Sequence, residues 1–267
     1  MAQVKVGIIG CGTIGSALAK MIERRFGTAA SLSFLCDHQP AKAATLQKKL
    51  TSKPAILSRD ELIRKSGLVI EAASAHVSGQ IAQTALRQGK DVLVLSVGGL
   101  LSFAALRMTG KGRLWIPSGA IAGVDALLAA KEAGLQSVKL VTRKPPAGLS
   151  EAPYFKKKKF PKLQGAKEYC VFKGNAAKAV QNFPQNINVA ALLSLAGLGP
   201  KKTQVEIWTS HSYRANQHEV TIVSKAGEIR TVTRNVPFPE NPKTSALAAY
   251  SAAALLRKIF SSLRAGT

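Results

Sequence analysis

The sequence predicts an α/β protein in which a doubly wound domain with a parallel sheet precedes a second domain of the α+β class. Over residues 4–116, short apolar runs alternate with amphipathic segments, which is typical of strands and helices in βαβ units. Residues 203–210 and 217–234 instead alternate polar with apolar side chains, as antiparallel strands do. A chain of 267 residues that is 46% hydrophobic can bury two cores, so the composition excludes disorder as its main state.

The N-terminal elements follow one another in a regular order. The first is a continuous apolar run that ends in a glycine cluster, which suits a parallel strand buried on both faces. We expect strands over residues 4–9, 31–36, 68–73, 91–96 and 113–116. We expect helices between them, over residues 14–25, 41–50 and 77–88.

The second part of the chain mixes helices with antiparallel strands. We expect a strand over 138–142, a hairpin that turns at Gly227, and helices over 123–133, 176–181 and 189–195. Residues 144–167 are rich in proline and lysine and are expected to form a mobile surface loop. A last helix is expected over residues 242–260, with Asn241 as its N-cap and Pro242 in its first turn.

The cysteine count and the hydropathy pattern bear on location. Three cysteines, Cys11, Cys36 and Cys170, in so long a chain indicate reduced thiols and an intracellular protein. No signal peptide opens the chain, and no apolar stretch reaches the roughly 20 residues of a membrane span. We therefore expect a cytoplasmic protein that does not enter a membrane.

The chain is strongly basic, with 38 Lys and Arg against 14 Asp and Glu and a formal net charge of +24. The excess is spread evenly over both halves, whereas a nucleic-acid-binding arm would concentrate it. An even spread favours steering of anionic ligands, with nonspecific nucleic-acid binding at low salt. One local cluster, Lys156–Lys159 beside Tyr154, Phe155 and Phe160, is either a solvated loop or a contact for nucleic acid or an acidic surface.

A glycine-rich motif predicts the cofactor. Residues 10–15 read Gly-Cys-Gly-Thr-Ile-Gly, follow an apolar strand and open an amphipathic helix. This is the context of a dinucleotide-binding Rossmann turn, whose glycines permit a tight turn, close approach of a pyrophosphate and packing of the helix on the sheet. A turn without ligand is the alternative. The expected contacts are Gly10, Gly12, Thr13, Ile14 and Gly15.

Further cofactor contacts are expected at the ends of later strands. Asp37 lies 22 residues after Gly15, where a carboxylate accepts hydrogen bonds from the ribose hydroxyls and repels a 2′-phosphate. It therefore favours NAD over NADP, although His38 and the positive surroundings weaken that preference. The small residues Ala73, Ser74, Ser96 and Val97 follow the next strands, where ligands bind in such sheets.

The later motifs are more specific. They are Ser-Gly-Ala-Ile-Ala-Gly-Val-Asp-Ala at 118–126, Thr-Arg-Lys at 142–144, Phe-Pro-Gln-Asn-Ile-Asn-Val-Ala-Ala at 183–191, Asn-Gln-His-Glu at 216–219 and Glu-Asn-Pro-Lys-Thr-Ser at 240–245. In this order behind the glycine motif, the set resembles the L-aspartate dehydrogenase family over essentially the whole chain. The lysine-rich segment at 154–167 is the main departure from that pattern.

The resemblance implies a fold, a reaction and some of its residues. It implies reversible conversion of L-aspartate, NAD(P)+ and water to iminoaspartate or oxaloacetate, ammonia and NAD(P)H, which can supply NAD biosynthesis. It implies a Rossmann domain of residues 1–117, completed by a C-terminal helix within 241–267. An α+β domain of residues 118–240 would carry the sheet that supports a homodimer. His218 corresponds to the family's active-site histidine, and Ala120 and Asn188 correspond to cofactor contacts.

The chemistry supports His218 independently. Oxidation at the substrate Cα gives an iminium ion, which water must attack before ammonia leaves, and a histidine that titrates near neutral pH can act as base and then as acid. His218 shares a strand face with Val220 and Ile222, so a satisfied core histidine is the alternative. His211, seven residues earlier, is expected on the other face.

Candidate substrate-binding residues lie in four of the motifs. A dicarboxylate suits lysine side chains and free backbone N–H groups at the start of a helix. The same residue types are also common in helix caps. The candidates are Ser118, Lys144 (or Arg143), Asn186, Lys243 and Thr244. The histidines and cysteines are scattered, so no metal site is predicted.

Two other functions remain open at this point. One is a related two-domain dehydrogenase that acts on a different amino acid or on a semialdehyde. The other is a non-catalytic protein that binds nucleotides or nucleic acid through a Rossmann frame, which would have no need of His218.

Overall fold

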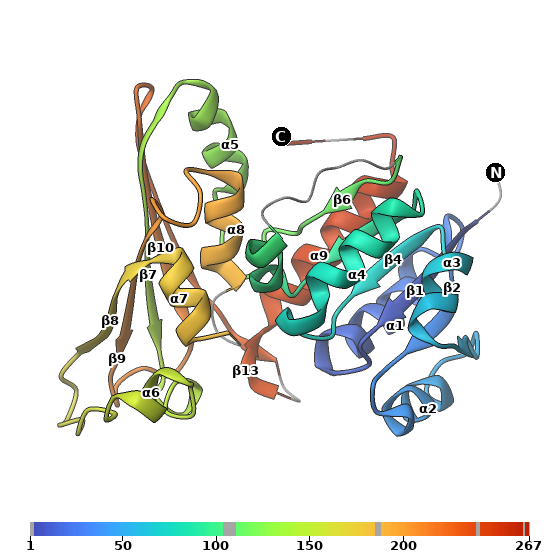
Figure 1. The fold of residues 1–267 in the computed structure, drawn as a ribbon, viewed down its shortest axis with the longest axis horizontal. Coiled ribbons are helices and arrows are strands. Elements are labelled where there is room, and N and C mark those ends of the chain that lie inside the picture. The colour runs from blue at the N-terminus through green and yellow to red at the C-terminus, as the bar shows by residue number, and fades with distance from the viewer. Residues whose placement is uncertain (1–2, 104–110, 185–187, 239–240, 264, 267) are drawn as a thin grey trace. The chain divides into compact units, whose positions relative to one another are not determined.

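The computed structural model describes residues 3–103, 111–184, 188–238, 241–263, 265 and 266 (Figure 1). The chain divides into two compact units, Met1–Pro117 with Ala249–Ala265, and Ser118–Ala248 with the last two residues. The chain thus returns to the first unit near its C-terminal end, at Ala249. In the described residues, no helix is long and apolar enough to cross a bilayer.

The first unit contains a six-stranded parallel sheet in the order β3-β2-β1-β4-β5-β6. The order reverses between β1 and β4, which is the switch point of a doubly wound sheet. The strands are β1 (Val4–Ile9), β2 (Ala30–Cys36), β3 (Ala55–Ile56), β4 (Leu68–Glu71), β5 (Asp91–Val94) and β6 (Leu114–Trp115). The predicted α/β class with a Rossmann-type sheet is confirmed.

Helices cover both faces of this sheet. They are α1 (Thr13–Arg25), α2 (Pro40–Lys48), α3 (Arg59–Lys65), α4 (Ala75–Arg87) and α9 (Ala246–Phe260), with the 3-10 helix η1 (Val97–Phe103). One apolar cluster joins Val6 and Ile8 of β1 to Leu18 of α1 and Leu256 of α9. Gly7 points to the opposite face, where a Cβ would collide with Leu62 of α3. The alternation along β1 therefore separates the two helical layers.

Sequence patterns missed β3 and α3. The strand has two residues, too few to give a period. The helix carries a capping signal instead: the Ser58 hydroxyl accepts from the Glu61 backbone N–H and donates to the Glu61 carboxylate. This is a capping box.

The second unit contains a five-stranded sheet in the order β11-β10-β7-β9-β8, antiparallel except for the β7–β9 pair. Its strands are β7 (Leu135–Lys144), β8 (Tyr169–Asn175), β9 (Gln204–Thr209), β10 (Gln217–Ser224) and β11 (Gly227–Arg234). Figure 1 shows α5 (Val124–Glu132), α7 (Ala176–Asn182) and α8 (Asn188–Ala196) together on one face. That face is buried, since Val138, Leu140, Val220 and Ile222 alternate inward.

The expectation of a mobile loop over 144–167 is wrong in part. This segment contains the 3-10 helix η2 (Pro146–Gly148) and α6 (Tyr154–Lys157). The rings of Tyr154 and Phe155 pack against Phe183, with centroids 5.0 and 6.0 Å away. The prediction relied on the proline and lysine content of the segment and overlooked these aromatic contacts, which hold the segment in place.

The start of the last helix also differs from the prediction. Asn241–Ser245 forms β13, which pairs with β12 (Pro237–Phe238), and α9 begins only at Ala246. The Ala246 N–H continues this pairing by donating to the Val236 carbonyl (2.9 Å). Strand pairing thus overrides the Asn-Pro signal for a helix start.

Candidate active site

A cavity of about 610 Å³ lies at the carboxyl ends of β1, β2 and β4 in the first unit. Five of the predicted cofactor residues line it: Gly10, Gly12, Asp37, Ala73 and Ser74. Sequence reasoning connected His38 only with the cofactor preference, and it assigned no role to four other polar lining residues: Lys42, Ser58, Arg59 and Asp60. They belong to the turn after β2 and to the starts of α2 and α3, where no short motif signals a ligand.

The glycines at this cavity have different structural roles. Gly10 has φ +103°, and a Cβ there would collide with the backbone of Ala72. A Cβ on Gly15 would collide with the Gly10 carbonyl. These two permit the turn and the close helix approach. Gly12 differs, since a Cβ there would meet nothing within 4 Å, so its missing side chain leaves open space in the cavity.

The residues present fit a dinucleotide. Gly12 is the N-cap of α1 and no side-chain hydrogen bond caps this helix, so the positive end of the helix dipole faces an anion here. Thr13 and Ile14 are the first two residues of that helix, and Gly15, the third, is buried. Backbone donors over an open glycine are what a pyrophosphate requires.

Asp37 connects the end of β2 to the glycine turn. Its Oδ2 accepts from the Cys11 N–H (2.7 Å) and its Oδ1 from the Gln39 N–H (2.8 Å), with His38 Nδ1 at 3.1 Å from Oδ1. Oδ2 keeps a further lone pair for a ribose hydroxyl. Burial, reinforced by the Asp37 charge, raises the pKa of the Cys11 thiol to about 12, so Cys11 is an inert filler.

A buried carboxylate, Glu71, holds the turns behind the cavity. It accepts from the backbone N–H groups of Ala73 (2.8 Å) and Ser96 (3.0 Å), while Ser78 Oγ donates to the Ser96 carbonyl (2.8 Å). Burial raises the pKa of Glu71, and these hydrogen bonds oppose that shift. Ser96 and the buried Val97 lie in this supporting layer and do not line the cavity.

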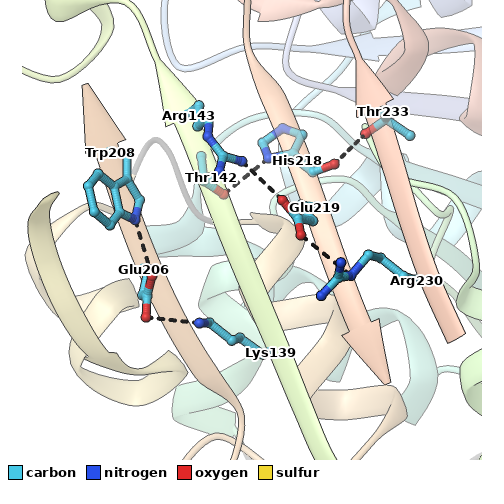
Figure 2. Close-up of polar contacts among 9 residues, drawn as sticks. All are labelled: Lys139, Thr142, Arg143, Glu206, Trp208, His218, Glu219, Arg230 and Thr233. Carbon is cyan, nitrogen blue, oxygen red and sulfur yellow. Dashed lines mark hydrogen bonds and ion pairs between the residues drawn. The ribbon is translucent and has the colours of Figure 1, made fainter. Parts of the chain in front are cut away.

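A second cluster lies on the buried face of the five-stranded sheet, where β7 and β10 pair. The register places Thr142 opposite His218, with Lys144 two residues further along β7 on the same face. All three are almost fully buried, with exposures of 1%, 4% and 5% for Thr142, His218 and Lys144. Thr142 Oγ1 lies 3.1 Å from His218 Nδ1, and Figure 2 shows the two side chains pointing toward each other.

Burial perturbs both titratable groups of this cluster. It lowers the pKa of the Lys144 ammonium to about 8. Burial, and next the Lys144 cation, lower the pKa of His218 to about 3. The expectation that His218 itself titrates near neutral pH is therefore wrong for the free protein, because desolvation disfavours the imidazolium. Lys144 is the member of the cluster that titrates near the physiological range.

A loop from the start of the second unit is tied to this sheet face. The Ala120 carbonyl accepts from Thr233 Oγ1 and from Asn235 Nδ2, each at 3.0 Å. Thr233 lies opposite His218 and also donates to the His218 carbonyl (3.4 Å). The predicted cofactor residue Ala120 therefore has its backbone held by two side chains from the end of β11 and the residue beyond it.

Comparison with known proteins identifies the family. Residues 125–259 match the model "Aspartate dehydrogenase, C-terminal", and residues 10–109 match "Homoserine dehydrogenase, NAD binding domain". The L-aspartate dehydrogenase of Methanosarcina acetivorans is 42% identical over 99% of this chain and 100% of its own length. The chain belongs to the L-aspartate dehydrogenase family.

Other members and neighbours agree with this assignment. L-aspartate dehydrogenase 3 of Bordetella bronchiseptica is 39% identical over 99% of this chain and 98% of its own length. The crystal structure of the aspartate dehydrogenase from Thermotoga maritima superposes with a TM-score of 0.77 at 25% identity, covering 99% of this chain and 100% of that one. A myo-inositol dehydrogenase from Lactobacillus casei, at 12% identity and a TM-score of 0.56, shares the fold alone.

The remaining predicted site residues have varied placements. Ser118 is half-buried at the start of the loop that contains Ala120, and Asn188 is the exposed first residue of α8. Lys243 and Thr244 lie in β13, so the expected first helical turn does not exist there. Asn186 lies outside the described residues. His211 is exposed in the turn after β9, away from the register position of His218.

The family motifs contain a signal for one residue that was missed, Thr142. Thr142 precedes Lys144 by two positions in a strand, which places both on one face, and the motif itself names them together. Asn235 carries no comparable signal, since its role depends on pairing beyond the end of β11, where its N–H donates to the Asn216 carbonyl (2.9 Å).

Proposed function

We propose that this protein catalyses the reversible NAD(P)-dependent oxidative deamination of L-aspartate to oxaloacetate and ammonia, through iminoaspartate. The observation that carries the proposal is the buried pair of Lys144 and His218 on one sheet face, in a chain whose full-length relatives are named L-aspartate dehydrogenases. A buried ammonium group can form a strong ion pair with a substrate carboxylate, because little water screens the two charges there.

The first unit supplies the cofactor site in this proposal. A nicotinamide cofactor held there would supply hydride transfer from or to the substrate Cα. The glycine turn and the N-terminus of α1 bind the pyrophosphate, and Asp37 accepts hydrogen bonds from the adenosine ribose. NAD is the favoured cofactor because Asp37 repels a 2′-phosphate. Lys42 and Arg59 line the same cavity and temper this preference, although Arg59 is paired with Asp60 at 3.1 Å.

The second unit supplies the substrate site. The Lys144 ammonium pairs with a substrate carboxylate, in surroundings where exclusion of water strengthens the interaction. Ser118, Asn186, Lys243 and Thr244 are the further candidates for the two carboxylates. Because negative charge favours protonated neighbours, dicarboxylate binding raises the pKa of both Lys144 and His218 above their values in the free protein.

His218 contacts the oxygen that enters and leaves at Cα. Its Nε2 makes no hydrogen bond to the described part of the chain, whereas Nδ1 is taken by Thr142. The backbone of His218 is held by Thr233, which also holds Ala120, the predicted nicotinamide contact. Pre-organisation of this kind reduces what must be ordered when substrate binds.

We also propose a homodimer that forms through the open face of the five-stranded sheet. This face carries Val232, which is 46% exposed, beside ion pairs of Glu219 with Arg143 (3.2 Å) and Arg230 (3.7 Å). Figure 2 shows this row of charged side chains across the strands. A sheet face with an exposed valine and paired charges is suited to contact with a second copy of itself.

The deciding experiment is oxidation of NADH by oxaloacetate, with and without ammonium, repeated with NADPH. We expect oxidation that depends on ammonium and is faster with NADH at subsaturating cofactor. Oxidation without ammonium would indicate a keto-acid reductase. Absence of oxidation, with NADH still bound, would contradict aspartate as the substrate and leave only the dinucleotide site.

A further inference from the structure

Thr142 is the only described residue that forms a hydrogen bond with the imidazole of His218. The two residues are directly opposite in the antiparallel β7–β10 ladder, and Oγ1 lies 3.1 Å from Nδ1. Either atom can be the donor in such a contact, and the choice decides what His218 presents at its other nitrogen. A neutral imidazole carries one proton, so Nε2 is a donor when Nδ1 accepts and an acceptor when Nδ1 donates.

The hydrogen-bonding needs of Thr142 distinguish the two arrangements. Its hydroxyl has a proton of its own and is buried, and its contact with Nδ1 is the only hydrogen bond of that hydroxyl among the described residues. If Nδ1 donated, the hydroxyl proton would be buried without an acceptor, which is costly in a dry site. If the hydroxyl donates, both groups are satisfied.

We propose that the Thr142 hydroxyl donates to Nδ1 and thereby holds His218 as the Nε2–H tautomer, so that Nε2 donates a hydrogen bond to the substrate's keto oxygen. Thr142 is then a positioning residue that acts through His218. The identity of the substrate in this inference rests on the proposed function above, but the tautomer itself does not.

The surroundings keep the imidazole neutral, as this arrangement requires. Lys144 is on the same strand face, and its charge together with burial disfavours a second proton on the ring. The charged groups of Arg143 and Glu219 pair with each other on the opposite face of the sheet (Figure 2). They therefore do not compete with Thr142 for the ring.

This tautomer gives His218 one hydrogen-bonding role in each direction of the reaction. A neutral Nε2–H polarises the keto carbonyl toward attack by ammonia, and in the other direction it orients the oxygen of the entering water. No proton has to leave the imidazole for either effect, which suits a histidine that is buried without a carboxylate partner among the described residues.

The tautomer can be measured directly. The full-length protein, labelled with ¹⁵N-histidine and saturated with NADH, would be examined by long-range ¹H–¹⁵N correlation NMR at neutral pH. The His218 signals would be assigned by their loss in His218→Asn. We expect a pyridine-like Nδ1 and a pyrrole-like Nε2 in the unsubstituted protein and in Thr142→Ser. A pyrrole-like Nδ1 in the unsubstituted protein would overturn the proposal.

Kinetics test the positioning role. Thr142→Val keeps the shape and removes the donor, and we expect kcat for oxaloacetate reduction to fall about tenfold to a hundredfold, with an unchanged KM for NADH. Thr142→Ser should recover most of the loss, and Thr45→Val, the same change at an exposed position of α2, should leave activity unchanged. Equal kcat in Thr142→Val and the unsubstituted protein would contradict the role of Thr142.

The outcomes separate this inference from the proposed function. If oxaloacetate is not a substrate, the NMR experiment still reports whether Thr142 sets the tautomer. If the tautomer is reversed while ammonium-dependent oxidation is observed, the proposed function stands and the assignment of Nε2 as donor fails. Should Thr142→Val be poorly folded, Thr142→Ser and the unsubstituted protein still decide the question.

Discussion

At the scale of single residues, the most informative side chains are polar ones in places that favour apolar ones. Lys144 and His218 occupy positions on the same buried sheet face as Leu140 and Val220. Apolar residues at these two positions would avoid the free-energy cost of burying polar and charged side chains in the core. An ammonium group and an imidazole on this face suit the anionic substrate that we propose.

The first prediction concerns His218. We expect His218→Ala to lower kcat for the ammonium-dependent reaction by about 10²–10⁴-fold, the usual range when a positioned donor or acid–base group is lost. NADH affinity, measured by fluorescence titration, should change little, because His218 is not among the residues that line the cofactor cavity. The matched control is His211→Ala, an exposed histidine of the same unit, which should retain activity. Turnover that survives His218→Ala would remove His218 from the mechanism.

The second prediction is a pH dependence set by Lys144. Burial lowers its pKa to about 8 in the free protein, so the ammonium that binds a carboxylate is present below that pH and is lost above it. We expect kcat/KM for oxaloacetate to fall as the pH rises through about 8. The Lys144→Met variant should have a low kcat/KM without this falling limb. An unchanged profile in Lys144→Met would assign the limb to another group.

At the scale of elements, the turn between β1 and α1 allows a test that separates binding from folding. Gly12 has φ −75° and open space where a Cβ would stand, so Gly12→Ala should fold normally. The methyl group would instead occupy space that the pyrophosphate needs. We expect the Kd for NADH to rise at least tenfold, with an unchanged Tm of the free protein.

The control for this third prediction is Gly148→Ala, a glycine of η2 whose added Cβ would also meet nothing within 4 Å. It should alter neither Tm nor NADH affinity. If Gly12→Ala binds NADH normally, the cavity does not hold the pyrophosphate over Gly12.

The elements also show why sequence patterns predicted one half of the molecule better than the other. Buried parallel strands such as β1 and β4 are continuous apolar runs followed by turns, and local signals suffice for them. β8 was missed because only Phe172 of its residues is buried. β13 was predicted as the start of a helix because its pairing with β12 cannot be seen in a local window.

Local sequence patterns likewise predicted one part of the candidate site and missed the other. The glycine turn and Asp37 could be predicted because they are close in sequence to the strands that position them. The contact of Thr142 with His218 joins residues 76 positions apart, and the bonds from Thr233 and Asn235 to Ala120 span more than a hundred. Such partners follow from the register of β10 between β7 and β11, which only the fold supplies.

At the scale of the whole molecule, the net charge of +24 gives the fourth prediction. A positive field attracts oxaloacetate, and added salt screens it over a Debye length of about 8 Å at physiological ionic strength. We expect KM for oxaloacetate to rise as potassium chloride increases, while kcat changes less. A flat response would mean that the excess of lysine and arginine does not act on substrate capture.

The fifth prediction concerns assembly. If the open face of the second sheet joins two copies, light scattering after size exclusion should give twice the 28.2 kDa of one chain. Val232→Lys places a charge at the exposed apolar position of that face and should shift the equilibrium toward the monomer. Thr45→Lys, at an exposed position of α2 in the other unit, serves as the control for added charge. A monomeric unsubstituted protein would contradict the homodimer.

The return of the chain to its first unit has a consequence for biosynthesis. Ala252, Ala253 and Leu256 of α9 fill the same apolar cluster as Leu18 and Ile22, yet a ribosome makes them more than two hundred residues later. Until then the nascent N-terminal unit carries an uncovered apolar strip, which holdase chaperones bind. A messenger truncated before α9 would therefore yield a product that is prone to degradation. In a circular permutant that begins with α9, the helix would be made first, so the apolar strip should be covered as soon as the N-terminal unit is complete.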